Sequence, residues 1–304
     1  MPTRRHALWL AGLAAMFAAT PVLAQDKAQY KINVVATFSI LADLVKNVGG
    51  DRVEVSALVG PNSDTHVFSP TPADAKKLAD AKVVFVNGLG LEGWMTRLVK
   101  ASGTKAPTFV ASTGVKSRKM EDDHHPGRMM TDPHAWQSIA NTKTYVGNIR
   151  DGLSKADAAG KSVYEANANA YLAKLDALEQ EVKAAIGKIP ADHRRIITTH
   201  DAFGYFGGAY GMEFISPEGV STDSQPSAKD VAKIIAQIRT QKIPGVFMEN
   251  ITDPRLMQQI AKETGAKIGG TLYSDALSDP SGPAGTYIDM MRSNIRELSK
   301  ALTS

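Results

Sequence analysis

The sequence predicts an α/β fold with two lobes, each a parallel-type sheet flanked by helices, joined by one long α-helix. Short β-rich runs alternate with helical stretches from residue 30 and again after residue 190, which is typical of parallel sheets covered by helices. Between them, residues 157–188 contain no proline and are rich in Ala, Glu, Lys, Leu and Gln. The expected domains are an N-terminal lobe (25–156), a linking helix (157–189) and a C-terminal lobe (190–304), after a signal peptide (1–24).

In the N-terminal lobe, strands and helices are expected to alternate. Ser39 is expected to be the N-cap of the first helix, and Thr71 the N-cap of the second, with Pro72 at the first helical position and Asp74 near the positive helix end. The expected strands are 32–37, 53–58 and 83–86, and the helices are 39–48, one starting at 72, and 91–100.

The linking helix is predicted from apolar residues that recur every three, four or seven positions, and Pro190 closes it. These residues are Tyr164, Tyr171, Leu175, Leu178, Val182 and Ile186. The alternation then resumes, with expected strands at 195–199, 212–215, 246–248 and 267–271, and helices at 227–241, 254–264 and 285–301.

The N-terminus indicates export. Arg4 and Arg5 precede an apolar run over 7–19, with a cleavage site between Ala24 and Gln25, as in a secretory signal peptide. We expect a periplasmic protein, and the Arg pair leaves Sec and Tat export both open. No later stretch is apolar enough to span a membrane.

Composition excludes several classes of protein. Zero cysteines exclude disulfides, thiolate metal sites and a lipid anchor on cysteine. A net charge of only +4, two units of which leave with the signal peptide, argues against nucleic acid as a partner.

Three histidines and an aspartate are the candidate metal ligands: His66, His134, His200 and Asp275. Each lies where a strand is expected to end or a loop to begin, and ligands of open parallel sheets bind outside the carboxyl ends of the strands. Because two come from each lobe, we expect all four to meet in the cleft between the lobes. Three imidazoles and one carboxylate form a four-coordinate shell that suits Zn²⁺.

Carboxylates near these histidines are candidates for orienting them. Asp64, Asp132 and Asp201 lie within two residues of the three histidines, and a ligating imidazole usually gives its second N–H to a carboxylate or carbonyl. For Asp64 a turn role is at least as well supported. Glu249 is the best alternative carboxylate, with a structural role preferred.

The remaining histidines have other expected roles. His193 precedes the strand that His200 follows, so we expect it to be solvated at the opposite edge of the sheet. His124 and His125 lie in a short acidic segment, 121–127, which is either an auxiliary metal-capture segment or a polar loop.

Four segments resemble, in order, the metal motifs of the zinc/manganese solute-binding proteins of ABC importers (cluster A-I, the TroA-like and ZnuA-like family). They are 60–74, 132–136, 200–206 and 274–278, and the resemblance covers 32–302. It implies a monomeric periplasmic receptor, not an enzyme, that hands a divalent metal to a permease in the inner membrane. Manganese members usually carry Glu at the third motif, where this chain has His200. Zn(II) is therefore expected, with Mn(II) open.

Two other readings compete with this one. A secreted zinc hydrolase needs an open metal position and a nearby base, whereas four protein ligands leave no open position and no His-Glu-x-x-His run is present. A periplasmic metal chaperone or adhesin without a transporter would use the same site, and one sequence does not separate it from a receptor.

Overall fold

The structure, a computed structural model, describes residues 31–121, 127, 129–223 and 226–303. Residues 31–304 form one unit that contains two four-stranded β-sheets and a two-stranded hairpin. The expected signal peptide with its cleavage site after Ala24, and the pair His124 and His125, lie outside the described residues. Within the described part, no helix combines the length and apolar character that crossing a bilayer requires.

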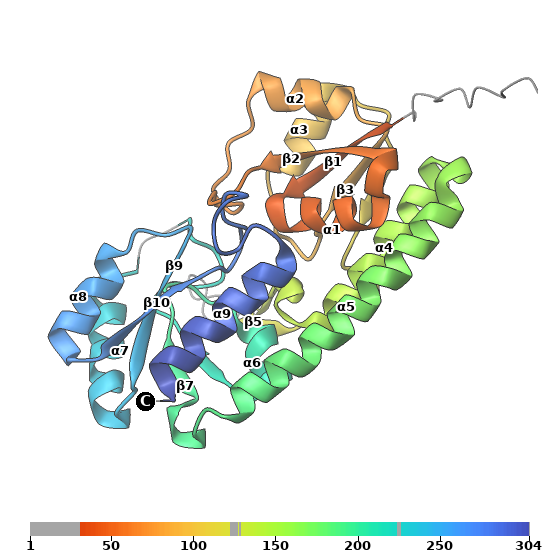
Figure 1. The fold of residues 1–304 in the computed structure, drawn as a ribbon. Coiled ribbons are helices and arrows are strands. Elements are labelled where there is room, and N and C mark those ends of the chain that lie inside the picture. The colour runs from red at the N-terminus through yellow and green to blue at the C-terminus, as the bar shows by residue number, and fades with distance from the viewer. Residues whose placement is uncertain (1–30, 122–126, 128, 224–225, 304) are drawn as a thin grey trace, which may run out of the picture. The chain divides into compact units, whose positions relative to one another are not determined.

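The N-terminal sheet is parallel throughout, in the order β2-β1-β3-β4 (Figure 1). This confirms the parallel sheet that the alternating pattern predicted, and it adds a short fourth strand. The strands are β1 Ile32–Phe38, β2 Val53–Val59, β3 Val83–Val86 and β4 Thr108–Val110, and the helices between them are α1 Ser39–Gly49, α2 Pro72–Ala79 and α3 Met95–Ser102.

Two predicted helix caps have different outcomes. Thr71 and Asp74 form the capping box of α2, with Pro72 at its first position, as predicted. Ser39 is not an N-cap, because Phe38 holds that position and Ser39 is already helical. The Ser39 hydroxyl instead accepts a hydrogen bond of 3.0 Å from the backbone N–H of Leu277, at the other end of the sequence.

The predicted linking helix is α5, Lys161–Gly187, whose 27 residues bury all six apolar side chains named above. Helix α4, Ile139–Ala156, runs beside it (Figure 1). The prediction placed the start of α5 at residue 157, but Asp157 is the C-cap of α4. Its carboxylate accepts hydrogen bonds from Arg52 (2.8 Å) and from the Tyr164 hydroxyl (2.7 Å), and this interaction separates the two helices.

The C-terminal sheet is also parallel, in the order β10-β9-β7-β8. Its strands are β7 Arg195–Ile197, β8 Glu213–Ile215, β9 Gly245–Glu249 and β10 Lys267–Leu272, and its helices are α6 Gly204–Tyr210, α7 Ala228–Gln241, α8 Arg255–Thr264 and α9 Tyr287–Leu302. Helix α6 and an antiparallel hairpin, β5 Lys119–Glu121 with β6 Met129–Thr131, were not predicted. Short 3₁₀ helices cover Gly50–Arg52, Ala135–Gln137, Ala158–Gly160 and Ala191–His193.

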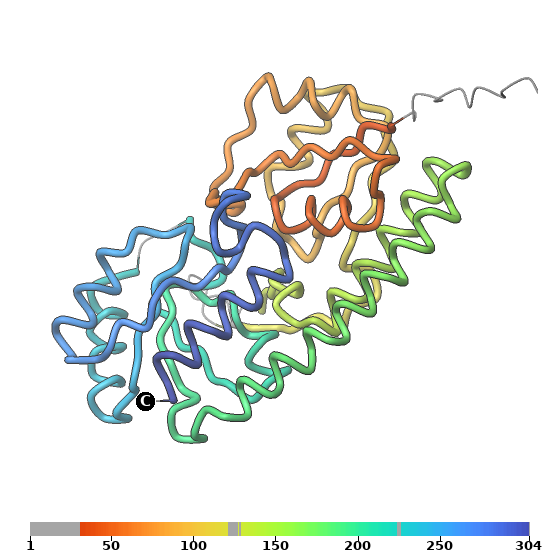
Figure 2. The backbone as a smooth tube through the Cα atoms, viewed as in Figure 1, coloured from red at the N-terminus to blue at the C-terminus, as the bar shows by residue number. Residues whose placement is uncertain are grey.

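Two hydrophobic cores cover opposite faces of the C-terminal sheet. Alternate strand residues point to opposite faces, so Ile196 and Phe247 enter one core while Ile197 and Val246 enter the other. The first core is large and continues through α9 and α5 into the N-terminal sheet. Figure 2 shows the course of the long helix α5 along the backbone. The second core is small and lies under α7 and α8.

Candidate metal centre

The four predicted residues come together in the structure. One ligand atom from each of His66, His134, His200 and Asp275 lies within 4.8 Å of the others. The Asp275 carboxylate is 3.0 Å from His66 Nε2, 3.2 Å from His200 Nε2 and 3.6 Å from His134 Nε2. A tetrahedral ion with bonds of about 2.1 Å requires ligand atoms about 3.4 Å apart, so these spacings fit a single four-coordinate ion.

Each residue reaches the centre from the end of a strand or from the loop that follows it. His66 lies in the loop after β2, His134 just after β6, His200 three residues after β7, and Asp275 three residues after β10. The three-residue offsets in the C-terminal sheet follow from its parallel order, which puts the carboxyl ends of β7 and β10 at the same edge. His134, His200 and Asp275 are fully buried, whereas His66 retains some side-chain exposure.

Several buried atoms at the centre lack a hydrogen-bond partner within the described ranges. They are both carboxylate oxygens of Asp275 and the Nε2 atom of His200. A buried polar atom without a partner costs free energy, so a native structure that keeps several together indicates a ligand that satisfies them. A divalent cation would do so for Asp275 and for the imidazole nitrogens that face it.

His134 is held by its neighbour Asp132, as predicted. Its Nδ1 lies 2.9 Å from the Asp132 carboxylate, which also accepts the His134 backbone N–H at 2.9 Å. The backbone around this pair is fixed in turn, because Tyr205 donates to the Asp132 carbonyl and Asn87 donates to the Pro133 carbonyl. With its proton on Nδ1, the imidazole presents the lone pair of Nε2 to the centre.

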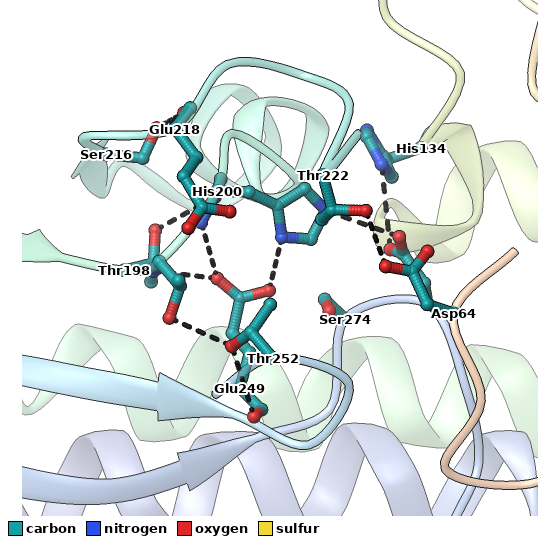
Figure 3. Close-up of polar contacts among 12 residues, drawn as sticks. Asp64, His134, Thr198, His200, Ser216, Glu218, Thr222, Glu249, Thr252 and Ser274 are labelled. Atoms are coloured by element: carbon teal, nitrogen blue, oxygen red, sulfur yellow. Dashed lines mark hydrogen bonds and ion pairs between the residues drawn. The ribbon is translucent and has the colours of Figure 1, made fainter. Parts of the chain in front are cut away.

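His200 is supported by Glu249, not by Asp201 as the sequence suggested. Glu249 lies beside His200 (Figure 3), with Oε2 at 2.6 Å from His200 Nδ1. Its Oε1 accepts the backbone N–H groups of Thr199 (2.8 Å) and His200 (2.9 Å). The reason is strand order: β9, which ends in Glu249, is the immediate neighbour of β7. Asp201 instead uses its backbone N–H, which donates to the Gly219 carbonyl.

His66 has no comparable support. Asp64 Oδ1 accepts the His66 backbone N–H at 2.8 Å, which is the turn role and not the imidazole role. The other oxygen of Asp64 accepts a short hydrogen bond from the Thr222 hydroxyl (Figure 3). In the part of the chain that the structure describes, Nδ1 of His66 has no partner, whereas its Nε2 faces His134 and Asp275.

The charges at the centre favour a proton in the absence of a cation. Burial opposes a charged imidazole, but the carboxylates of Asp275 and Asp132 outweigh it and raise the pKa of His134 to about 9. Burial likewise opposes charge on His200, yet Glu249 and Asp275 hold its pKa well above the usual value. For Asp275, burial is outweighed by His134 and His200, which keep its pKa well below the usual range. A metal ion must therefore displace protons from these imidazoles.

Two further residues differ from the sequence analysis. His193 is half-buried, not solvated, and its Nδ1 lies 2.9 Å from the carbonyl oxygen of Leu302 in the last helix. Glu218, which no sequence pattern singled out, is a buried carboxylate beside the centre, and burial raises its pKa to about 7. It belongs to an irregular loop, where periodicity gives no signal.

Comparison with known proteins gives consistent results. Residues 34–301 match the family described as ZnuA, the periplasmic component A of a zinc-uptake complex. The chain is 32% identical over 302 residues to the manganese ABC transporter substrate-binding lipoprotein PsaA of Streptococcus pneumoniae, covering 97% of each chain. It is 33% identical over 270 residues to the iron-binding protein YfeA of Yersinia pestis, covering 89% of this chain and 86% of that one.

A solved structure shares the fold. The periplasmic zinc-binding protein TroA from Treponema pallidum superposes with a TM-score of 0.83 and 30% identity, over 90% of this chain and 100% of that one. A manganese-bound periplasmic metal-binding protein from Candidatus Liberibacter asiaticus, also 30% identical, gives a TM-score of 0.79 over the same shares.

Proposed function

Since this chain belongs to the ZnuA family of periplasmic metal-uptake components, we propose that it is a periplasmic receptor that binds one Zn²⁺ and delivers it to the permease of an ABC importer. At the coarser level, it is a metal-binding, substrate-binding protein of an ABC transporter. The proposal adds the identity of the metal, the ligands, the compartment and the delivery step.

The single observation that carries the proposal is the cluster of potential metal-ligand atoms around Asp275. Three imidazole nitrogens surround a buried carboxylate that has no hydrogen-bond partner among the described residues. We propose His66, His134, His200 and Asp275 as the four ligands. Four protein donors complete a tetrahedral shell and leave no position for a catalytic water, which supports a binding role over a hydrolase.

Zinc is proposed over manganese on donor chemistry. Imidazole nitrogen suits Zn²⁺, whereas Mn²⁺ prefers carboxylate, carbonyl and water oxygens. The relatives do not decide this point, because their names specify manganese, iron and zinc in turn. A manganese receptor of the same family is therefore the second candidate.

Membership of the family supports a proposal for the partner and the compartment. We propose that a permease with its ATPase receives the metal, that residues 1–24 direct export and are removed, and that the mature receptor acts in the periplasm as a monomer. The division into an N-terminal lobe (25–156), a linking helix (157–189) and a C-terminal lobe (190–304) is part of the same proposal. His66 and His134 would then come from the N-terminal lobe, and His200 and Asp275 from the C-terminal lobe.

Metal analysis of the protein purified from its own periplasm tests the proposal, followed by competition between Zn²⁺ and Mn²⁺ for the metal-free protein. We expect about one zinc per chain, and Zn²⁺ should displace bound Mn²⁺ completely at equal total concentrations. Isolation with manganese, and retention of it against equimolar zinc, would support the second candidate. Failure to retain either metal would remove the receptor assignment.

A further inference from the structure

Glu218 is a buried carboxylate without a partner. It exposes only 7% of its surface, yet its carboxylate has no hydrogen bond or ion pair within the ranges that the structure describes. Its backbone is well fixed, because its N–H donates to the Thr199 carbonyl and its C=O accepts from the Ser216 hydroxyl. Figure 3 shows the side chain extending from the 216–222 loop toward His200. Keeping an ionised group in this position is unfavourable unless a cation balances it.

The Glu218 carboxylate lines a pocket that is open to solvent. The pocket has a volume of about 640 Å³ and lies between the 216–222 loop, the His66 loop and the start of α8. Its charged lining is formed by Asp64, Glu218, Asp253 and Arg255. Arg255 is the one cationic group in this lining, and it is already paired with Asp253. The charge that remains unbalanced in the pocket is therefore that of Glu218 and Asp64.

The size of the pocket and the hydrogen bonds of Asp64 decide the form of the cation. Both carboxylate oxygens of Asp64 already accept hydrogen bonds, one from the His66 backbone N–H and the other from the Thr222 hydroxyl. A bare ion would thus not be shared between Asp64 and Glu218. An ion that keeps six waters needs about 200 Å³, which the pocket provides. Carboxylates bind such a hydrated ion through its water molecules, as is usual for hard divalent cations.

The pocket is continuous with two ligand loops of the buried centre. Asp64 accepts the backbone N–H of His66, and Glu218 donates its N–H to Thr199, the residue before His200. The hydrogen bond from Thr222 to Asp64 links these two loops across the side of the centre. Displacement of either loop would thus bring a cation in the pocket into contact with the imidazoles.

We propose that this pocket is a second cation site, in which the carboxylates of Glu218 and Asp64 hold a hydrated divalent cation outside the buried centre. Its role as a staging point for the transported metal rests on the proposed function, whereas its ability to bind a cation does not. Burial already raises the pKa of Glu218 to about 7, so the site is best populated at pH 8, where the carboxylate is ionised.

The test uses Mn²⁺ as the probe on protein first loaded with one equivalent of Zn²⁺, at pH 8 and low salt. Free Mn²⁺ is followed by its electron paramagnetic resonance signal. Wild type should bind one additional Mn²⁺ with a Kd on the order of 10⁻⁴–10⁻³ M, typical of weak oxygen-ligand sites, and Glu218→Gln should lose it. The matched control is Glu213→Gln, which removes the same charge from an exposed residue that pairs with Arg195, and it should keep the additional site.

A kinetic measurement tests the staging role. In stopped-flow mixing, Glu218→Gln should slow zinc association with the metal-free protein by roughly tenfold at low salt, because a focused negative potential raises the on-rate of a cation. The equilibrium affinity of the buried centre should stay unchanged. The thermal midpoint at pH 8 should be equal to or above that of wild type, since the variant loses a buried, unbalanced charge.

The outcomes separate the two proposals. Equal Mn²⁺ uptake by wild type and Glu218→Gln would overturn the second site, as would a lowered thermal midpoint, which would assign Glu218 a structural role. If wild type failed to retain zinc in the loading step, the proposed function would fail. The Glu218-dependent difference in Mn²⁺ uptake would still be measured and would support the outer site alone.

Discussion

His134 and His200 enter the centre from rigid, buried backbone, whereas His66 enters from a partly exposed loop. Each of the first two has a carboxylate at its Nδ1, Asp132 at 2.9 Å and Glu249 at 2.6 Å. The loop that carries His66 contains exposed residues on both sides, including Val67, which exposes 53% of its surface. In the described structure it is fastened mainly by the hydrogen bonds of its backbone and of Asp64.

The difference shows which side of the centre opens. Buried loops with satisfied hydrogen bonds resist local opening, whereas exposed loops with few buried contacts open at low free-energy cost. We therefore expect His134, His200 and Asp275 to form a preorganised set of three ligands, called the half-shell below, which His66 completes. We expect the ion to enter and leave by displacement of the His66 loop.

The largest effect on zinc affinity is expected from the loss of the Asp275 charge. Asp275→Asn removes the charge that faces all three imidazoles, and its loss should weaken zinc binding by well over about a hundredfold, the upper range for outer partners of ligands. His66→Ala should cost less than His200→Ala, because the half-shell survives. Competition with a chelator measures the zinc affinity of all three variants. His193→Ala is the control, because His193 contacts the Leu302 carbonyl and none of the four candidate ligands. Equal losses for His66→Ala and His200→Ala would break the comparison.

Next in size is the effect of pH. In the metal-free protein the pKa of His134 is raised to about 9, so the proton is present at neutral pH and must leave when the metal binds. Because the pKa of His200 is raised as well, the apparent affinity should rise by at least about tenfold per pH unit from pH 6 to 8, and it should level off only above about pH 9. Calorimetry in two buffers of different ionisation enthalpy would show the released proton. An affinity that is flat from pH 6 to 8 would contradict a protonated half-shell.

The orienting carboxylates sharpen the comparison further. Asp132→Asn and Glu249→Gln should each weaken zinc binding by about 10–100-fold, the usual contribution of groups that orient a ligating histidine. Asp64→Asn removes a charge at a similar distance along the sequence from its histidine. It should change the equilibrium affinity by less than about threefold, because Asp64 contacts the His66 backbone and the Thr222 hydroxyl and not the His66 imidazole. A comparable loss in all three variants would show that His66 is supported as well as the others.

The smallest expected effect concerns the fastening of the His66 loop. Thr222→Val keeps the shape of the side chain and removes its hydrogen bond to Asp64. A hydrogen bond contributes about 1 kcal/mol, so zinc dissociation should become about fivefold faster while the thermal midpoint changes little. Release into a fluorescent chelator measures the rate. Thr252→Val, at the neighbouring hydroxyl of the same pocket, is the control and should leave the rate unchanged.

The sequence was sufficient for features that depend on local pattern. The alternation of strands and helices predicted both parallel sheets, and the apolar spacing in 164–186 predicted the buried face of α5. His200 and Asp275 meet because each follows a strand of the parallel C-terminal sheet, and that rule needs no knowledge of strand order. Whether they bind metal remains a prediction.

Features that depend on non-local neighbours were missed. The choice of Glu249 over Asp201 requires β9 to lie beside β7. Ser39 was assigned to a helix cap from its local sequence, because its hydrogen bond to Leu277 joins residues 238 positions apart and leaves no local signal. Helix α6 contains three glycines in seven residues, which weakens the helical pattern, and the strands of the β5–β6 hairpin are only three residues long. Glu218 lies in a loop without periodicity.

The last helix packs into the same core as the first strand. Tyr287 of α9 is completely buried, its backbone N–H donates to Asp43 in α1, and its hydroxyl donates to the carbonyl of Trp136. A ribosome that has made the chain only as far as residue 280 has therefore produced a polypeptide whose main core is still open. Contacts of such long range also make folding slow. The chain should consequently complete its main core only after the last helix has been synthesised.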